Sequence, residues 1–173
     1  NSYTITYGDA LPTFEYTSSG ADISGAPTIT CTATATSPVG TYPITISKGS
    51  VTNYNDSYVN GTLTITKAPL TITAKSYTKK QGEENPTFEV EYSGFNNGET
   101  AIVLSTQPTV TCAATSASEP GTYEITVSGA EAGNYDISYV KGTLTVVAAD
   151  ALVVTANSYT ITYGDALPTF EYT

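Results

Sequence analysis

The stretch GTYPITI at residues 40–46 places Tyr42, Ile44 and Ile46 on one face at a period of two. The stretch GTYEITV at residues 121–127 repeats this pattern. Such alternation is typical of antiparallel strands that bury one face against a core. Shorter segments alternate in the same way at residues 29–33, 63–65, 110–114 and 144–146. The chain is therefore predicted to be mainly β.

Internal repeats decide the domain organisation. Residues 157–173, NSYTITYGDALPTFEYT, repeat residues 1–17 letter for letter, and a looser copy begins at Lys75. A second repeated segment begins at Pro27 and again at Pro108. These spacings give a period of roughly 75–82 residues, which indicates an array of small domains.

We divide the chain into a first repeat at residues 1–68, a second and complete repeat at 69–149, and the start of a third at 150–173. Each repeat should open with a strand, which is LTITA at residues 70–74 and ALVVTA at residues 151–156. The first repeat lacks this opening strand. We therefore expect the second repeat to fold alone and the first not to fold fully by itself.

Two small β folds fit the pattern of strands. An Ig-like sandwich of antiparallel sheets is favoured, and a β-grasp-like sheet with one short helix is the alternative. The helix would be formed by residues 97–104, which overlap an insertion around Phe95–Ala101 that the first repeat lacks. Because one repeat omits most of this helix, we interpret it as decoration on the fold.

The sequence VNGT at residues 59–62 places Asn60 and Gly61 between two alternating runs. Asn-Gly in such a position predicts a type I′ hairpin turn. Gly142, preceded by Lys141, takes the same position in the second repeat.

The segment that follows the opening strand of each repeat differs between copies. Ile5 and Tyr7 of the first copy are replaced by Lys79 and Gln81 in the second. A face that accepts both apolar and charged side chains is expected to be exposed, so this segment is predicted to be an edge or an extended arm.

Aromatic residues that recur in both copies are expected to be structural. Phe14 and Phe88 would anchor the arms, and Tyr42 and Tyr123 would fill the sandwich core. Four further tyrosines are expected on the predicted hairpin: Tyr54, Tyr58, Tyr135 and Tyr139.

Composition and charge exclude several classes of function. The net charge is −10, with six Lys and Arg together and no His, so the chain lacks the basic surface that nucleic acids require. No apolar run reaches about 18 residues, so we expect no membrane span in this fragment. The chain has no His to serve as a general base, and no pair of carboxylates marks a glycosidase cleft. No catalytic residue is assigned.

Each repeat carries one cysteine, Cys31 and Cys112, at matching positions. Both cysteines lie at alternate positions that are predicted to face the core. We therefore expect them to be small buried hydrophobic residues, with reduced thiols that lie far apart. A bridge between them would need Cα atoms closer than about 7 Å, which equivalent core positions of successive domains do not provide.

Carboxylates fall in or near predicted turns, and Ca²⁺ takes oxygen ligands in flexible geometry. No DxDxDG-type spacing is present. We therefore expect no cofactor, and Ca²⁺ at the seams between domains is the alternative. The carboxylates concerned are Asp9, Asp22, Asp56, Glu83, Glu84, Glu99, Glu131 and Asp136.

Several motifs resemble one known family. YGDALPTF at residues 7–14, GTY at residues 40–42 and YVNGTLTI at residues 58–65 resemble the YGX-type MBG repeats of bacterial surface adhesins. The second copy departs at the name-giving motif, with KQGE at residues 80–83, but it keeps PTF at residues 86–88. The resemblance spans nearly the whole chain, and its motifs are short and structural.

The resemblance implies a large exported protein in which such repeats stand in series. We therefore expect a location on the outside of a bacterial cell, contacts with neighbouring repeats, and a non-catalytic role as a stalk or spacer. The alternative is an adhesive module that binds host glycan or protein through exposed Tyr and Thr. The resemblance carries over no catalytic or ligand residues.

Residues 151–173 contain the opening strand that the first repeat lacks, followed by a copy of residues 1–17. An unfilled strand position exposes backbone groups that template pairing. We expect this tail to add a strand to the first repeat of a neighbouring molecule, in a head-to-tail contact.

Overall fold

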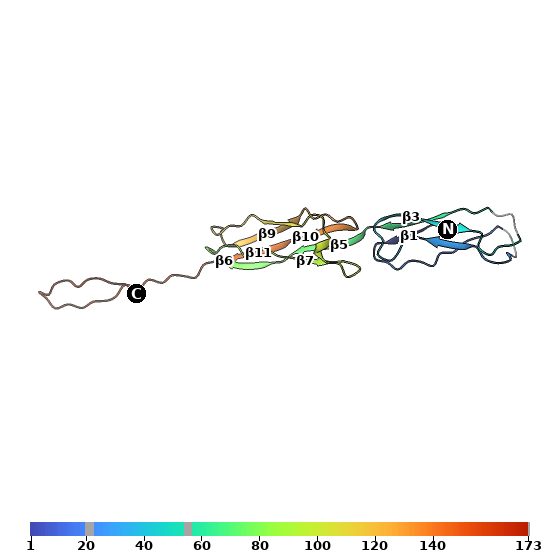
Figure 1. Cartoon of the computed structure of the whole chain (residues 1–173). Coiled ribbons are helices and arrows are strands. Elements are labelled where there is room, and N and C mark those ends of the chain that lie inside the picture. The colour runs from blue at the N-terminus through green and yellow to red at the C-terminus, as the bar shows by residue number, and fades with distance from the viewer. Residues whose placement is uncertain (20–22, 54–56, 173) are drawn as a thin grey trace.

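The computed structural model describes residues 1–19, 23–53 and 57–172. The described chain is nearly all β, and its strands form three sheets. Figure 1 shows these sheets in two units joined end to end, with the last residues of the chain extending beyond the second unit. The prediction of a mainly β chain built from tandem domains is confirmed.

The first unit contains one four-stranded sheet. In order across the sheet, its strands are β1 (Tyr3–Thr6), β4 (Gly61–Thr66), β3 (Gly40–Ser47) and β2 (Thr28–Cys31). β1 runs parallel to β4, and the other two pairs are antiparallel. The alternating apolar residues Ile44, Leu63 and Ile65 are buried. The period of two seen in the sequence therefore marks the core face of this sheet.

The second unit contains two sheets, as the sandwich prediction requires. One sheet consists of β10 (Tyr135–Val140), β5 (Ala68–Ala74) and β7 (Val90–Ser93). The other consists of β6 (Tyr77–Lys80), β11 (Gly142–Val147), β9 (Gly121–Ser128) and β8 (Thr109–Cys112). β5 lies in the middle of its sheet and also contacts β9 of the facing sheet. Its residues Leu70 and Ile72 are fully buried, so β5 closes the core.

The predicted type I′ hairpin is wrong. β10 pairs with β5, whereas β11 pairs with β6 and β9, so the chain crosses from one sheet to the other at Lys141. Gly61 likewise begins β4, which pairs with β1 and β3. In the second unit the chain keeps its direction as it crosses from β5 to β6 and from β10 to β11, so both resulting pairs are parallel. The alternating pattern alone does not reveal such pairs.

The predicted helix is reduced to a single 3-10 turn, η1 (Ala101–Val103). A β-grasp sheet would need a helix packed on one face, and the described residues contain no longer helix than this turn. The insertion is also more than decoration, because its residues Asn96 and Glu99 form hydrogen bonds with Tyr7 of the first unit.

The inference that the face of β1 and β6 is exposed is wrong, although both are edge strands as predicted. Tyr7 is 3% exposed and Lys79 is 5% exposed. The Lys79 ammonium donates hydrogen bonds to the carbonyl oxygens of Glu83 at 2.9 Å and Thr115 at 2.7 Å. A buried lysine is tolerated here because its charge is bonded to backbone oxygens.

The tail folds locally but buries little. Its Leu152, Val153 and Val154 are 88%, 77% and 58% exposed. A single β-bridge joins Ala156 to Tyr172. The tail therefore presents an apolar strand sequence to solvent.

Candidate binding groove and inter-domain seam

A groove opens on the first unit where the second unit carries β5. In the second unit β5 fills the space between β10 and β7. Among the described residues, the first unit has no strand in that position, and a cavity of about 860 Å³ lies there instead. The cavity is therefore the counterpart of a strand position.

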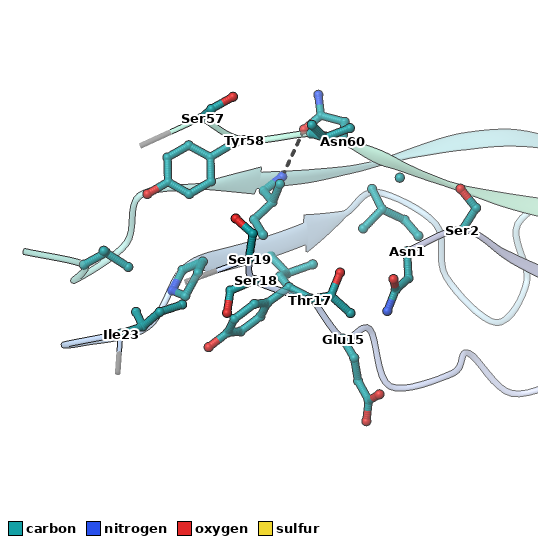
Figure 2. A pocket seen from close by; sticks show the side chains of 18 residues that line it. Asn1, Ser2, Glu15, Thr17, Ser18, Ser19, Ile23, Ser57, Tyr58 and Asn60 are labelled. Carbon is teal, nitrogen blue, oxygen red and sulfur yellow. Dashed lines mark hydrogen bonds between the residues drawn. The ribbon is translucent and has the colours of Figure 1, made fainter. Parts of the chain in front are cut away.

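The groove has an apolar floor and two polar walls. Ile29, Ile44 and Ile46 of β2 and β3 lie at its floor. Figure 2 shows residues 57–60 along one side and residues 15–19 along the other. By sequence alignment of the repeats, these walls correspond to β10 and β7 of the second unit. The walls are therefore placed as the two neighbours of an inserted strand.

Two glycines mark where an arm passes close to the sheet. A Cβ atom at Gly142 would lie 2.4 Å from the carbonyl oxygen of Lys75, and one at Gly61 would lie 1.9 Å from that of Asn1. Any side chain at these positions would collide with backbone. Asn1 therefore occupies, at the end of the groove, the place that Lys75 occupies just after β5.

A hydrogen-bonded seam joins the two units. The Tyr7 hydroxyl donates to Glu99 Oε1 at 2.6 Å, and the Tyr135 hydroxyl donates to the other oxygen of the same carboxylate. Asn96 Nδ2 donates to the Tyr7 carbonyl oxygen at 2.7 Å. The Val39 amide donates to Asn134 Oδ1 at 3.0 Å.

Aromatic packing accompanies these bonds. The rings of Tyr7 and Tyr135 meet edge to face, with centroids 5.6 Å apart, and Phe95 packs on Tyr135 at 5.5 Å. Burial and the hydrogen bond to Glu99 raise the pKa of Tyr135 to about 12. The hydrogen bond to Glu99, together with burial, also raises the pKa of Tyr7. Both hydroxyls therefore stay protonated and donate to the carboxylate at neutral pH.

The Tyr-Gly-Asp motif forms the turn that presents Tyr7 to the seam. The Asp9 amide donates to the Thr6 carbonyl oxygen, and the Thr6 amide donates to Asp9 Oδ2 at 2.8 Å. Gly8 has a φ of 91°, a conformation that favours glycine. A Cβ atom there would lie 2.5 Å from the side chain of Asn96. The glycine therefore serves both the turn and the close approach of the second unit.

The recurring aromatic residues hold local elements together. Phe14 packs on Tyr3 and Phe88 packs on Tyr77, with ring centroids 5.5 Å and 5.7 Å apart. The hydroxyls of Tyr42 and Tyr123 donate to backbone carbonyl oxygens four residues earlier, at 2.8 Å in both units. All four predicted structural residues are partly buried.

The remaining residues that the sequence marked as structural are the two cysteines, Asn60, Gly61 and Gly142. Cys31 and Cys112 are free and partly buried, which is less than the full burial expected of them. They end the equivalent strands β2 and β8 of different sheets. Asn60 and Gly61 border the groove, where Asn60 Oδ1 accepts a hydrogen bond from the Ile46 amide at 3.1 Å.

Tyr135 was expected on a surface hairpin and is instead 2% exposed, because it lies at the seam. Tyr139 is 37% exposed, and its hydroxyl accepts a hydrogen bond from the Ala130 amide at 2.8 Å. Tyr58 borders the groove, and Tyr54 lies outside the described residues.

The carboxylates singled out in the sequence do not converge. Across residues 1–19, 23–53 and 57–172, no group of three or more His, Cys, Asp or Glu side chains could hold a metal ion. Glu99 serves the seam, and Glu83 caps the turn after β6 by accepting from the Lys80 amide. Asp22 and Asp56 lie outside the described residues.

Contacts between neighbouring repeats were expected, but the hydrogen-bonded set that forms the seam was not identified from the sequence. Its residues Asn96 and Glu99 belong to the insertion, and their partner Tyr7 is one of the two arm positions that differ between copies. An insertion in one repeat together with a tyrosine in the preceding repeat is the signal that could have revealed the contact.

Within the described part of the chain, no helix is long and apolar enough to cross a membrane.

Comparison with known proteins agrees with this repeat architecture. A family model for the MBG domain (YGX type) matches residues 1–64 and residues 70–145. A comparison with curated proteins gave no match. The first matched segment covers the four strands of the first unit almost completely, and the second covers most of the strands of the second unit. The chain therefore belongs to the MBG domain family of YGX type and contains two copies of the domain in tandem.

Proposed function

We propose that this chain is a spacer segment in the stalk of a bacterial cell-surface adhesin, where it holds a distal part of the protein away from the cell. The observation that carries this proposal is the seam between the two units. A spacer needs a fixed angle between successive domains, since a flexible joint would let the array fold back on itself.

The connection between the units is short, and hydrogen bonds join the two units beside it. Only Lys67 separates the end of β4 from the start of β5. Beside this link, Tyr7, Asn96 and Glu99 form side-chain hydrogen bonds across the seam. Flexible linkers are instead rich in Gly and Ser. The joint thus combines a one-residue linker with a buried contact, which favours a stiff rod.

A catalytic role has little support. The family is generally non-catalytic. Among the described residues, the cavity of the first unit is lined by apolar, amide and hydroxyl side chains and by the carboxylate of Glu15. The chain also contains no His. A non-catalytic structural role is the simpler interpretation of this chemistry.

Direct binding of host glycan or protein through exposed aromatic side chains is the second candidate. Clustered, solvent-facing tyrosines would support it. In the two units, the tyrosines that are at least 37% exposed are Tyr16 and Tyr139 among the described residues, and they lie on different units. The spacer role is therefore favoured.

The spacer proposal is tested by measuring the angle between the units. Spin labels are placed at Ser47→Cys and Ser128→Cys, equivalent exposed positions of β3 and β9, after both native cysteines are changed to alanine. We expect a single narrow distance distribution by pulsed electron resonance. Glu99→Ala should broaden this distribution, because it removes the acceptor that both seam hydroxyls share.

The control is Glu84→Ala, an exposed carboxylate of the second unit, which should leave the distribution narrow. A broad distribution in the parent protein would contradict the spacer role. Saturable binding to an immobilised host glycan, lost in Tyr16→Ala or Tyr139→Ala, would favour the adhesive candidate instead.

A further inference from the structure

The insertion of the second unit carries an Asn-Gly pair beside the seam. The sequence contains two such pairs, Asn60-Gly61 and Asn97-Gly98. In an Asn-Gly pair the glycine nitrogen can attack the side-chain amide of the preceding asparagine, because glycine has no side chain to obstruct the approach. The two pairs lie in different structures, so they should differ in this reaction.

Asn97 and Gly98 form the tip of an exposed turn. Their φ values are 55° and 72°, and the Glu99 amide donates to the Asn96 carbonyl oxygen at 2.9 Å. Positive φ at both central residues is the signature of a type I′ turn. The bond that closes this turn does not use the Gly98 amide, and among the described residues nothing lies within 4 Å of a Cβ position at Gly98. The attacking nitrogen therefore has open surroundings.

Asn60 and Gly61 are instead held in the sheet of the first unit. Asn60 Oδ1 accepts a hydrogen bond from the Ile46 amide at 3.1 Å, and Gly61 is the register partner of Ile44 in β3. Closing a ring between Asn60 and Gly61 would break the side-chain hydrogen bond and distort the first residue of β4. This pair is therefore a protected counterpart within the same chain.

Asn97 lies beside the carboxylate that joins the two units. The Tyr7 hydroxyl donates to Glu99 Oε1 at 2.6 Å. This hydrogen bond and burial raise the pKa of Tyr7, and a hydrogen bond from the Asn97 side chain offsets part of the rise. A chemical change at Asn97 would therefore act directly on the seam.

We propose that Asn97 is a site of spontaneous deamidation and that its conversion loosens the seam. The Gly98 nitrogen bonds to Asn97 Cγ, and its proton passes through water to the side-chain nitrogen, which leaves as ammonia. A water molecule then opens the cyclic succinimide at either of its carbonyl carbons. The products are aspartate and isoaspartate, in which the main chain runs through the former side-chain carbon.

Both products add a negative charge next to Glu99. The amide of Asn97 can donate to the Tyr7 hydroxyl, whereas a carboxylate can only accept from it. The new carboxylate therefore competes with Glu99 for the same proton donor, and the two like charges repel each other. The contact that Tyr7 makes across the seam is weakened as a result.

Isoaspartate also lengthens the turn. The present turn places Asn96 and Glu99 together on Tyr7, since Asn96 Nδ2 donates to the Tyr7 carbonyl oxygen at 2.7 Å while Glu99 accepts from its hydroxyl. An added main-chain atom at residue 97 shifts these two side chains relative to each other. The pair can then no longer hold Tyr7 from both sides as it does before the reaction.

Peptide mapping by mass spectrometry tests the reaction. The whole chain is aged in mildly alkaline solution, which favours attack because the nitrogen reacts after losing its proton. We expect the amide of Asn97 to be lost and isoaspartate to form there, while Asn60 keeps its amide. Asn97→Gly is the control, because glycine accepts the positive φ of the turn and has no amide to lose.

The effect on the seam is measured with the spin-labelled pair at residues 47 and 128, after the aged protein is returned to neutral pH. We expect a broader distance distribution after ageing than before it. Asn97→Asp should be broad without ageing, and Asn97→Gly should have the same width before and after. Circular dichroism confirms that the sheets remain folded in each sample.

The possible failures are distinct. Loss of the amide at Asn60 as fast as at Asn97 would show that the exposed turn does not select the site. Equal widths in fresh and aged parent protein would overturn the loosening of the seam, and so would equal broadening of Asn97→Gly on ageing. The proposal does not rest on the spacer role, which a broad distribution in the fresh protein contradicts independently of any loss of amide.

Discussion

Ile46 in the first unit and Val127 in the second occupy the same position of equivalent strands, β3 and β9. Val127 is 5% exposed, whereas Ile46 remains partly exposed and borders a cavity. The difference lies in β5, which contacts β9 in the second unit and has no counterpart among the described residues of the first. One strand thus decides whether the same alternating sequence forms a closed core or an open groove.

The claim that β5 closes the core of the second unit is tested most severely by Leu70→Ala. Leu70 is fully buried, so we expect the free energy of unfolding of the second unit to fall by about 2–5 kcal/mol. Leu152→Ala changes the equivalent position of the exposed tail. In dilute solution it should change the free energy of unfolding by less than about 0.5 kcal/mol. Urea unfolding followed by circular dichroism measures both. Equal losses would show that β5 is not the source of the difference.

The close approach of Gly142 to Lys75, directly after β5, should give the next largest effect on stability. Gly142→Ala would place a methyl group 2.4 Å from the Lys75 carbonyl oxygen, and we expect a loss of about 1–3 kcal/mol from overpacking. Gly133→Ala is the control, because nothing lies within 4 Å of its Cβ position. Thermal unfolding of the two variants should separate them clearly. An unchanged Gly142→Ala variant would contradict the close packing of arm and sheet.

The buried lysine distinguishes the arms of the two units. Lys79→Met leaves two backbone carbonyl oxygens without their side-chain donor, and we expect a loss of about 1–2 kcal/mol. Lys80→Met changes the adjacent exposed lysine, whose partner Asp150 is largely exposed, and should cost less than about 0.5 kcal/mol. Chemical denaturation at one pH compares them. A larger loss of stability in Lys80→Met than in Lys79→Met would contradict the stabilising role of the buried lysine.

The seam should be the feature that depends on alkaline pH. The pKa of Tyr135 is raised to about 12 in the folded protein, above the ordinary value of about 10 for the unfolded chain. The folded state therefore holds this proton more tightly. The stabilisation is fully present below about pH 10 and is lost as the pH rises towards 12.

We expect the distance distribution between the two units to broaden over that range of pH while the sheets remain folded. A Tyr7→Phe and Tyr135→Phe double variant should lack this transition. Pulsed electron resonance on the labelled pair measures the distribution, and circular dichroism monitors the sheets. A transition of unchanged size in the double variant would assign the pH dependence to other tyrosines.

The sequence was sufficient for the strands but not for their partners. The alternation around Tyr42 and Tyr123 correctly located β3 and β9, because one face of each strand is buried. The same alternation around Gly61 and Gly142 suggested hairpins, since local pattern does not specify which sheet a strand joins. That choice depends on contacts between residues distant in sequence, such as Gly142 with the arm at Lys75.

The contacts between units were harder to foresee. The replacement of Ile5 by Lys79 predicts an exposed position, because a lone lysine is seldom buried. The structure instead provides two backbone oxygens for its ammonium group. Burial of Tyr7 depends on Asn96 and Glu99 of the next unit, and no pattern within one repeat contains that information.

The parallel pairing of β1 with β4 also determines how the molecule responds to tension. When the chain is pulled from its two ends, β1 is drawn backward along its length and β4 forward. Because the two strands run in the same direction, the pull acts along the ladder and loads its four residue pairs together. A hairpin pulled from its open end would instead lose its bonds one after another. The same geometry recurs between β6 and β11, so a series of such units would resist stretching by shear in every unit.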